Sequence, residues 1–331
     1  RGGVYNSNII NITRNNGNNF IIKVVLLDTR YFKDPRHVSN GDFLGEEQWK
    51  WLENELNDKS VDIILLGSSI QVLPTQKIVE ETWSVFPEAR NRLLRLISYS
   101  PCSNIILLSG DVHMAEVSQA FCTPSVELYF ENGPQKRHLW EFTSSGLSHT
   151  FTTEYRLKPR YENETIDQYN YKSRIQIRNR GFLANSLFNM YQATYPAAYR
   201  ENRFKDQYKG VHYGSIDVIL DPSDDSSFSS TSKNEKFQPY LLFKILNHLN
   251  EAVITKTIPI HPKFSTSTLK LLEESYNKTK DNKLIEVEES YCEPYWGKEV
   301  TYRKVLFLFC MAVYLFILIS IPLTLILWLI G

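Results

Sequence analysis

The residues of this chain best suited to chemistry are Asp111 and His113, within Ser109-Gly110-Asp111-Val112-His113. They follow an apolar run typical of a buried strand, and α/β sheets bind ligands beyond the carboxyl ends of such strands. A carboxylate and an imidazole two residues apart suit a catalytic divalent or trivalent metal ion. Gly110 is expected to let the backbone turn sharply. The alternative is an ordinary strand-end turn in which Asp111 accepts hydrogen bonds from backbone amides.

Two other apolar runs also end in polar residues. Asp28 and Arg30 follow the run 20–27, and Gln71 closes the polar loop after the run 61–66. Three buried strands with such ends predict one shared polar cleft. For Asp28 and Arg30 the alternative is a buried ion pair that fixes the loop.

The common nucleophile, nucleotide and zinc motifs are absent from the sequence, which contains no GxxxxGK[ST], GxGxxG, HExxH, CxxC or GxSxG. Ser144 or Ser145 as nucleophile and His149 as base would suit a Ser/His hydrolase. No strand–turn–helix elbow is expected around them, so the sequence argues against that chemistry.

The positioning elements alternate between strands and helices. Buried strands are expected at 20–27, 61–66 and 104–108, and helices at 45–57 and 87–98. This order predicts an α/β fold whose strands are covered on both faces. Shorter strands are expected at 115–122, 126–130, 139–143, 212–220 and 240–246.

Composition limits the function classes. The 331 residues include 37 Lys plus Arg and 37 Asp plus Glu, a balance that excludes a nucleic-acid scaffold. Hydrophobic residues at 42% and aromatic residues at 13% exclude wholesale disorder. We expect one folded domain at 1–262, with an irregular insertion at 154–208 and a Ser-rich loop at 222–236. A charged juxtamembrane segment is expected at 263–304.

Six motifs in fixed order resemble the C-terminal half of PhoD-like metallophosphatases, within the calcineurin-like phosphoesterase superfamily. The motifs are Leu27-Asp28-Thr29-Arg30-Tyr31, Leu44-Gly45-Glu46-Glu47-Gln48-Trp49-x-Trp51-Leu52, Ser68-Ser69-Ile70-Gln71, Trp83 with Phe86-Pro87-Glu88-x-Arg90, Ser109-Gly110-Asp111-Val112-His113 with Glu116, and Thr143-Ser144-Ser145-Gly146-Leu147-x-His149. The resemblance covers roughly residues 1–220. It implies a two-sheet sandwich flanked by helices, and metal-dependent hydrolysis of phosphate mono- or diesters.

The resemblance also implies roles for single residues. Asp111 and His113 occupy the last metal motif, and Gln71 stands where the superfamily commonly has a His ligand. Gln71 and Asp28 are therefore either ligands of a hard ion or groups that orient the ligands. Arg30 is the candidate for phosphate contact. His149 could protonate a leaving group or pack below the cleft.

The family's first metal motifs lie upstream of the strand 20–27, so this chain is expected to be a fragment that lacks them and is inactive alone. Two or more ions are implied, with iron, calcium, zinc and manganese all open. The alternative function is a non-catalytic, membrane-anchored binding protein on the same fold.

The run 305–330 contains no charged residue and predicts one transmembrane helix. A cleaved lipid-anchor signal is the alternative, although 26 residues is long for one. Arg303 and Lys304 favour a cytosolic domain. Three glycosylation sequons favour a luminal or extracellular domain, and we adopt this orientation. The sequons begin at Asn11, Asn163 and Asn277.

Cys102 and Cys122 are expected to form a disulfide. Their midpoint, (102 + 122)/2 = 112, falls in the turn at 111–113, so a hairpin about that turn would bring the two side chains opposite each other. The alternative is two unrelated buried thiols. A disulfide would agree with an oxidising compartment.

Overall fold

The computed structural model describes residues 2–14, 17–74, 81–122, 129–130, 133–134, 137–148, 150, 205–221, 237–281, 292–294, 309 and 312. The described helices are α1 (Gly45–Leu56), α2 (Pro87–Tyr99) and α5 (Thr266–Asp281), with a 3-10 turn η1 at Trp83–Val85. The strands are β1 (Asn6–Thr13), β2 (Asn19–Leu26), β3 (Ile63–Gly67), β4 (Asn104–Ser109), β5 (Ala115–Cys122), β6 (Tyr129–Phe130), β7 (Gly133–Pro134), β8 (Arg137–Ser144), β9 (Gln207–Tyr208), β10 (His212–Ile219), β11 (Tyr240–Asn247), β12 (Ala252–Pro259) and β13 (Cys292–Pro294).

The larger sheet carries four parallel strands at its centre. Its order is β1-β2-β3-β4-β8-β5-β13, with β9 pairing with β5. β2, β3, β4 and β8 run parallel, and Gly67 of β3 pairs with Leu26 on one side and Leu108 on the other. The polar residues that follow these strands therefore emerge at one edge of the sheet.

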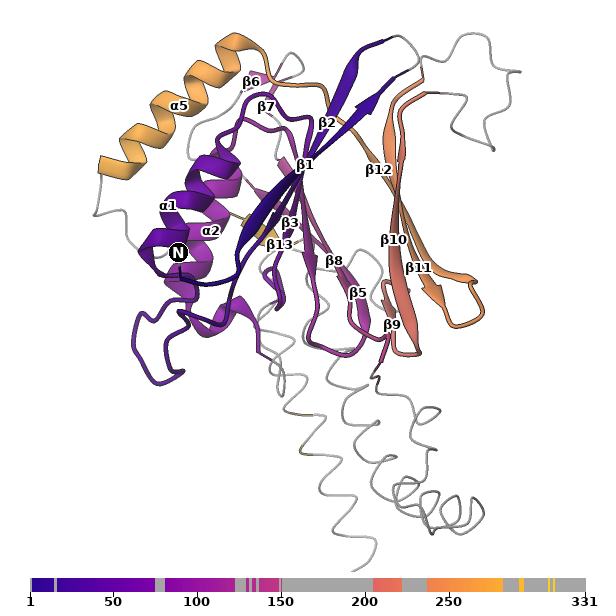
Figure 1. The fold of residues 1–331 in the computed structure, drawn as a ribbon. Helices are drawn as coiled ribbons and strands as arrows, with labels where there is room; N and C mark the ends of the chain where they lie inside the picture. Colours follow the sequence, from indigo (N-terminus) through magenta and orange to yellow (C-terminus); the bar gives the residue numbers. More distant parts are fainter. Residues whose placement is uncertain are drawn as a thin grey trace, which may run out of the picture.

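The two faces of this sheet are covered differently. Figure 1 shows α1 and α2 on one face and the three-stranded sheet β10-β11-β12 on the other. The strand sequences explain this arrangement, because successive side chains of a strand point to opposite faces. Along β3, Ile64 and Leu66 belong to the helix-facing core, whereas Ile63 and Leu65 pack with the smaller sheet.

The helices are held by their apolar stripes. In α1, Trp49, Leu52 and Leu56 are buried at helical spacing, and Glu46 and Glu47 lie in the first turn. α2 begins at a proline, which fits the first turn of a helix.

The structure is mixed α/β. It contains the three buried strands and the two helices that the sequence predicted around the site. The buried runs 20–27, 61–66 and 104–108 correspond to β2, β3 and β4, and the two expected helices to α1 and α2. β1, β7, β9, β12 and β13 were not expected. Within the segment 263–304, residues 266–281 form α5, whose Leu272 packs against Tyr99 of α2. The insertion 154–208 lies outside the described residues except for its last few, which include β9, and the loop 222–236 lies outside them altogether.

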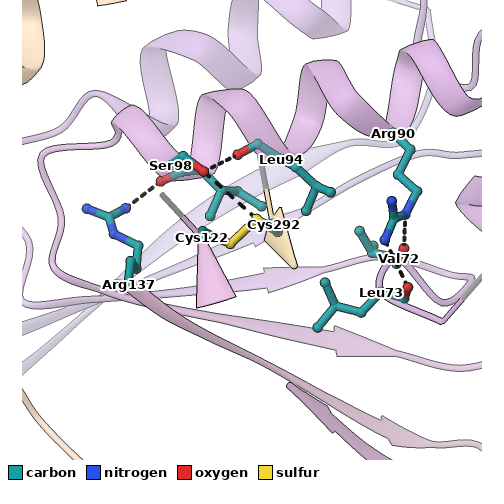
Figure 2. Close-up of a disulfide and its surroundings, with 9 residues drawn as sticks. Val72, Leu73, Arg90, Leu94, Ser98, Cys122, Arg137 and Cys292 are labelled. Atoms are coloured by element: carbon teal, nitrogen blue, oxygen red, sulfur yellow. Dashed lines mark hydrogen bonds between the residues drawn. A yellow bond between two sulfur atoms is a disulfide. The ribbon is translucent and has the colours of Figure 1, made fainter. Parts of the chain in front are cut away.

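The cysteine pairing expected from the sequence is wrong. Cys122 of β5 is bonded to Cys292 of β13, and Cys102 is a free, buried thiol. The hairpin assumption failed because β8 lies between β4 and β5, so Cys102 and Cys122 do not face each other. Figure 2 shows the bridge next to Ser98 of α2, whose hydroxyl lies 3.9 Å from the sulfur of Cys292.

The expected transmembrane run 305–330 lies outside the described residues except for positions 309 and 312. Among the residues that the structure describes, no helix has both the length and the apolar character that crossing a bilayer requires.

Candidate active site

The loop after β2 is organised by Asp28. Its Oδ1 accepts hydrogen bonds from the backbone N–H groups of Arg30 and Tyr31, at 2.9 and 3.0 Å, and its Oδ2 accepts one from Val4 at 2.9 Å. Burial alone would raise the pKa of Asp28, but these three donors outweigh it and the pKa lies below its ordinary value. Gln48 of α1 fixes the Asp28 backbone from the other side with two hydrogen bonds of 2.9 Å. Both carboxylate oxygens are thus used to shape the loop.

Arg30 connects two of the strand ends. Its Nη1 lies 3.0 Å from Glu81 Oε2, and its Nη2 lies 3.6 Å from Asp111 Oδ1. The Arg30 side chain thus binds these two carboxylates, while Asp28 is bonded to its backbone N–H. Arg30 is 54% exposed, which leaves part of its guanidinium open to an anion.

The turn after β4 has an unusual backbone. Asp111 and His113 have φ angles of 73° and 53°, in the left-handed region that non-glycine residues rarely adopt. Gly110, by contrast, has no positive φ, so the left-handed residues of this turn are Asp111 and His113 and not the glycine. Asp111 and His113, the residues that the sequence marks as best suited to chemistry, are thus also the residues of this turn that carry backbone strain, a frequent property of functional sites.

The His113 position is supported from β8 and β10. The Ser145 hydroxyl accepts a hydrogen bond from the His113 backbone N–H at 3.0 Å. The Ser145 N–H in turn donates to His212 Nε2 at 3.3 Å, and His212 Nδ1 lies 2.7 Å from the Gly210 carbonyl oxygen. Both contacts are satisfied by a neutral imidazole with its proton on Nδ1, and burial lowers the pKa of His212 accordingly.

Gln71 is fully buried beneath this edge. Its Nε2 donates to Glu116 Oε2 at 2.9 Å and to Thr143 Oγ1 at 2.8 Å. The Thr143 hydroxyl also lies 2.8 Å from the Ser109 hydroxyl. Gln71 therefore joins the ends of β3, β5 and β8, which fits an orienting role.

The residues present fit part of a metal-binding set. Asp111 and His113 offer a carboxylate and an imidazole, and Gln71 Oε1 is a buried oxygen without a hydrogen-bond partner among the described residues. Within the described ranges, no group of three or more His, Cys, Asp or Glu side chains is arranged to hold a metal ion. His149 lies outside the described residues.

Two groups of this site escaped sequence analysis. Glu81 is a buried carboxylate that binds Arg30, Lys33 and Arg36 together. Burial alone would raise its pKa, but hydrogen bonds and charge from Lys33 and Arg36 outweigh burial and lower it. The sequence did contain one indication of such a carboxylate, because the three basic residues recur at every third position. His212 gave none, because its partner Ser145 is 67 residues away.

Comparison with known proteins places these observations in a family context. A family model described as PhoD-like phosphatase matches residues 14–193. Alkaline phosphatase D of Bacillus subtilis (strain 168) is 23% identical over 145 residues, which are 37% of this chain and 24% of that protein. A solved structure described as "Structure of PhoD" has 23% sequence identity to this chain and a TM-score of 0.30. The match covers 41% of this chain and 28% of the chain in that structure. The chain thus spans about a quarter of the length of the curated relative.

Proposed function

Because this chain belongs to the PhoD-like phosphatase family, we propose that it is part of a metal-dependent phosphatase that hydrolyses phosphate mono- or diesters. The observation that carries the proposal is the 3.6 Å approach of Arg30 Nη2 to Asp111 Oδ1. A guanidinium that can bind phosphoryl oxygens lies beside a carboxylate that can bind a metal ion. The activity of the whole protein is part of the proposal, because the chain covers 24% of its curated relative.

Arg30 would hold the phosphoryl group. A guanidinium fork binds two oxygens at once, and the half-exposed Arg30 keeps donors available while Nη1 is anchored on Glu81. Lys33 and Arg36 bind the same carboxylate, at 2.9 and 3.2 Å. Three cations therefore gather around one buried carboxylate beside the place assigned to the phosphate ester.

Asp111 and His113 would hold the metal ion, together with ligands that the described residues do not include. Such an ion lowers the pKa of a bound water and polarises a phosphoryl oxygen. The contacts of Ser145 and His212 keep the His113 backbone in its left-handed conformation. His149 remains our candidate for protonating the leaving alcohol or for packing beside the site.

The test uses full-length protein and methyl p-nitrophenyl phosphate. Arg30→Gln and Asp111→Asn should each lower kcat/KM by about 100-fold, since each removes a charge that acts on the reacting group. Arg36→Gln is the matched control, because it makes the same charge change on the same loop, and should cost less than about fivefold. Arg30→Gln turnover within fivefold of wild type would contradict the assignment. A wild-type protein that binds inorganic phosphate without any turnover would favour the non-catalytic binding protein.

We further propose that residues 305–330 anchor the protein in a membrane, with the catalytic domain luminal or extracellular. Supporting this orientation, Asn11 and Asn277 are exposed, and a Cys122–Cys292 disulfide persists only in an oxidising compartment. Deletion of 305–331 should release the domain from carbonate-washed membranes. Glycosidase treatment should shift the wild type further on a gel than an Asn11→Gln, Asn277→Gln double variant. An unshifted wild type and free thiols at 122 and 292 would place the domain in the cytosol.

A further inference from the structure

A cavity of about 500 Å³ lies between the two sheets, beside the turn that carries Asp111 and His113. Its walls come from both sheets, and its size is that of a small-molecule site. Four serines, Gly214 and His212 form part of the lining, and its larger apolar side chains are Leu108, Phe142, Leu147, Tyr213, Ile216 and Phe243.

Small residues keep the sheets close at this end without filling the space between them. A Cβ at Gly214 of β10 would lie 3.2 Å from Ser144 Cβ of β8, so the two backbones approach closely there. Deeper in, the rings of Phe142 and Phe243 stack with centroids 3.7 Å apart. Because these aromatic rings are already packed, the cavity next to them is bounded by a fixed apolar surface.

The cavity and the candidate active site share two serines. Ser145 lines the cavity, and its hydroxyl accepts the hydrogen bond from the His113 backbone N–H at 3.0 Å. Ser109 also lines it and is the last residue of β4, two positions before Asp111. A group that occupies the cavity would therefore be adjacent to a phosphate held near Asp111.

The two sides of Asp111 differ in the charge of their described residues: the cavity side carries no charged side chain, whereas the Arg30 side carries cations. The described residues that line the cavity include no Asp, Glu, Lys or Arg, and the two contacts of His212 suit its neutral form. On the other side, Arg30 reaches Asp111 from a loop with three cations. An occupant with one anionic end and one apolar end matches this division.

We propose that the cavity binds the apolar alcohol portion of an amphiphilic phosphate ester, with an aliphatic chain of several carbons. This inference rests on the proposed function, because the phosphate end is assigned to Arg30 and Asp111. It names the substrate class: esters with an alkyl chain are preferred over esters of small or polar alcohols. Each methylene that leaves water for the cavity favours binding.

The test measures binding of methyl phosphonate and hexyl phosphonate to full-length protein by calorimetry. The hexyl compound should bind at least about tenfold tighter and with a more negative heat-capacity change. Ile216→Trp fills the cavity and should reduce this preference to within about twofold, with methyl phosphonate affinity unchanged. Ser215→Trp is the matched control, because Ser215 is the neighbour of Ile216 in β10 and does not line the cavity.

A second filling variant guards against misfolding. Ser148 is an exposed residue of the lining, and Ser148→Trp should also remove the preference for the hexyl compound. Equal affinities of wild type for the two phosphonates, or a tenfold preference that survives in both filled variants, would overturn the inference. Turnover of methyl p-nitrophenyl phosphate is measured in parallel. Turnover without a hexyl preference overturns this inference alone, whereas a hexyl preference without turnover overturns the proposed catalytic function alone.

Discussion

At the scale of single residues, Gly146 is required by the imidazole of His212. A Cβ at position 146 would overlap the Cε1 and Nδ1 atoms of that ring. The ring cannot simply move away, because it is held between the Ser145 N–H and the Gly210 carbonyl oxygen. The absence of a side chain at position 146 therefore supports the hydrogen bond by which Ser145 holds His113.

We predict that Gly146→Ala lowers the free energy of unfolding by about 1–3 kcal/mol, the usual cost of forcing atoms into a packed site. Gly110→Ala is the control, since a Cβ there would meet Ser69 O at an ordinary distance of 3.6 Å. It should change the unfolding free energy by less than about 0.5 kcal/mol. Urea titration monitored by tryptophan fluorescence measures both. Equal losses in the two variants would contradict this account of the turn.

At the scale of elements, Lys23 attaches β2 to the end of α1. It is a buried lysine in an otherwise apolar strand, with 7% of its side chain exposed. Its ammonium lies 3.2 Å from Glu55 Oε2 and 2.5 Å from Asp58 Oδ2. Burial raises the pKa of Asp58, but hydrogen bonds from Lys23 and Ser60 outweigh it and lower the pKa to about 2.

This pair predicts a pH-dependent contribution to stability. Because the folded pKa of Asp58 lies below the ordinary value of 3.8, its contribution is full above pH 3.8 and is lost as the pH falls through 2. Wild type should be about 1–2 kcal/mol more stable than Asp58→Asn at pH 6, and the difference should approach zero at pH 2. Chemical denaturation across that range measures it. The exposed Lys59–Glu273 pair provides the control, since Glu273→Gln should change stability by less than about 0.5 kcal/mol at either pH.

The positions of strands and helices near the site could be predicted from local sequence. Which strands pair, and which side chains meet, could not. Continuous apolar runs predicted β2, β3 and β4 because parallel strands buried on both faces lack polar alternation. The insertion of β8 between β4 and β5 has no local pattern, so the Cys102–Cys122 pairing failed. β1 was missed because its residues are mostly exposed, as expected for an edge strand. Asp111, Arg30 and Gln71 were found because they directly follow recognisable strands, whereas the contribution of His212 depends on how β10 packs against β8.

At the scale of the whole molecule, the Cys122–Cys292 bridge joins residues 170 positions apart. It fixes the short edge strand β13 to β5, at the opposite edge of the sheet from β1. Closing a loop of this length restricts the unfolded chain by about 5 kcal/mol in the chain-entropy model.

We predict that Cys292→Ser destabilises the fold by about 2–5 kcal/mol. Cys102→Ser is the matched control and should change little, because the serine hydroxyl can replace the thiol that donates to Asn104 O. Burial raises the pKa of Cys102 to about 11, so the native thiol should also resist alkylation. Thermal unfolding and non-reducing peptide maps measure these effects. A linked peptide that contains Cys102, or equal melting temperatures for the two variants, would contradict the observed bridge.

The same bridge gives the molecule a covalent ring. Between residues 122 and 292 the chain forms a closed circuit, so a protease that cuts the backbone once inside it produces two polypeptides that stay bonded. Asp111 and Arg30 would remain on one polypeptide. Ser145 and His212 would fall on the same or the other piece, depending on the cut, without leaving the molecule. A nicked protein would keep nearly its original mass under non-reducing conditions and separate into two pieces only when the sulfur–sulfur bond is reduced.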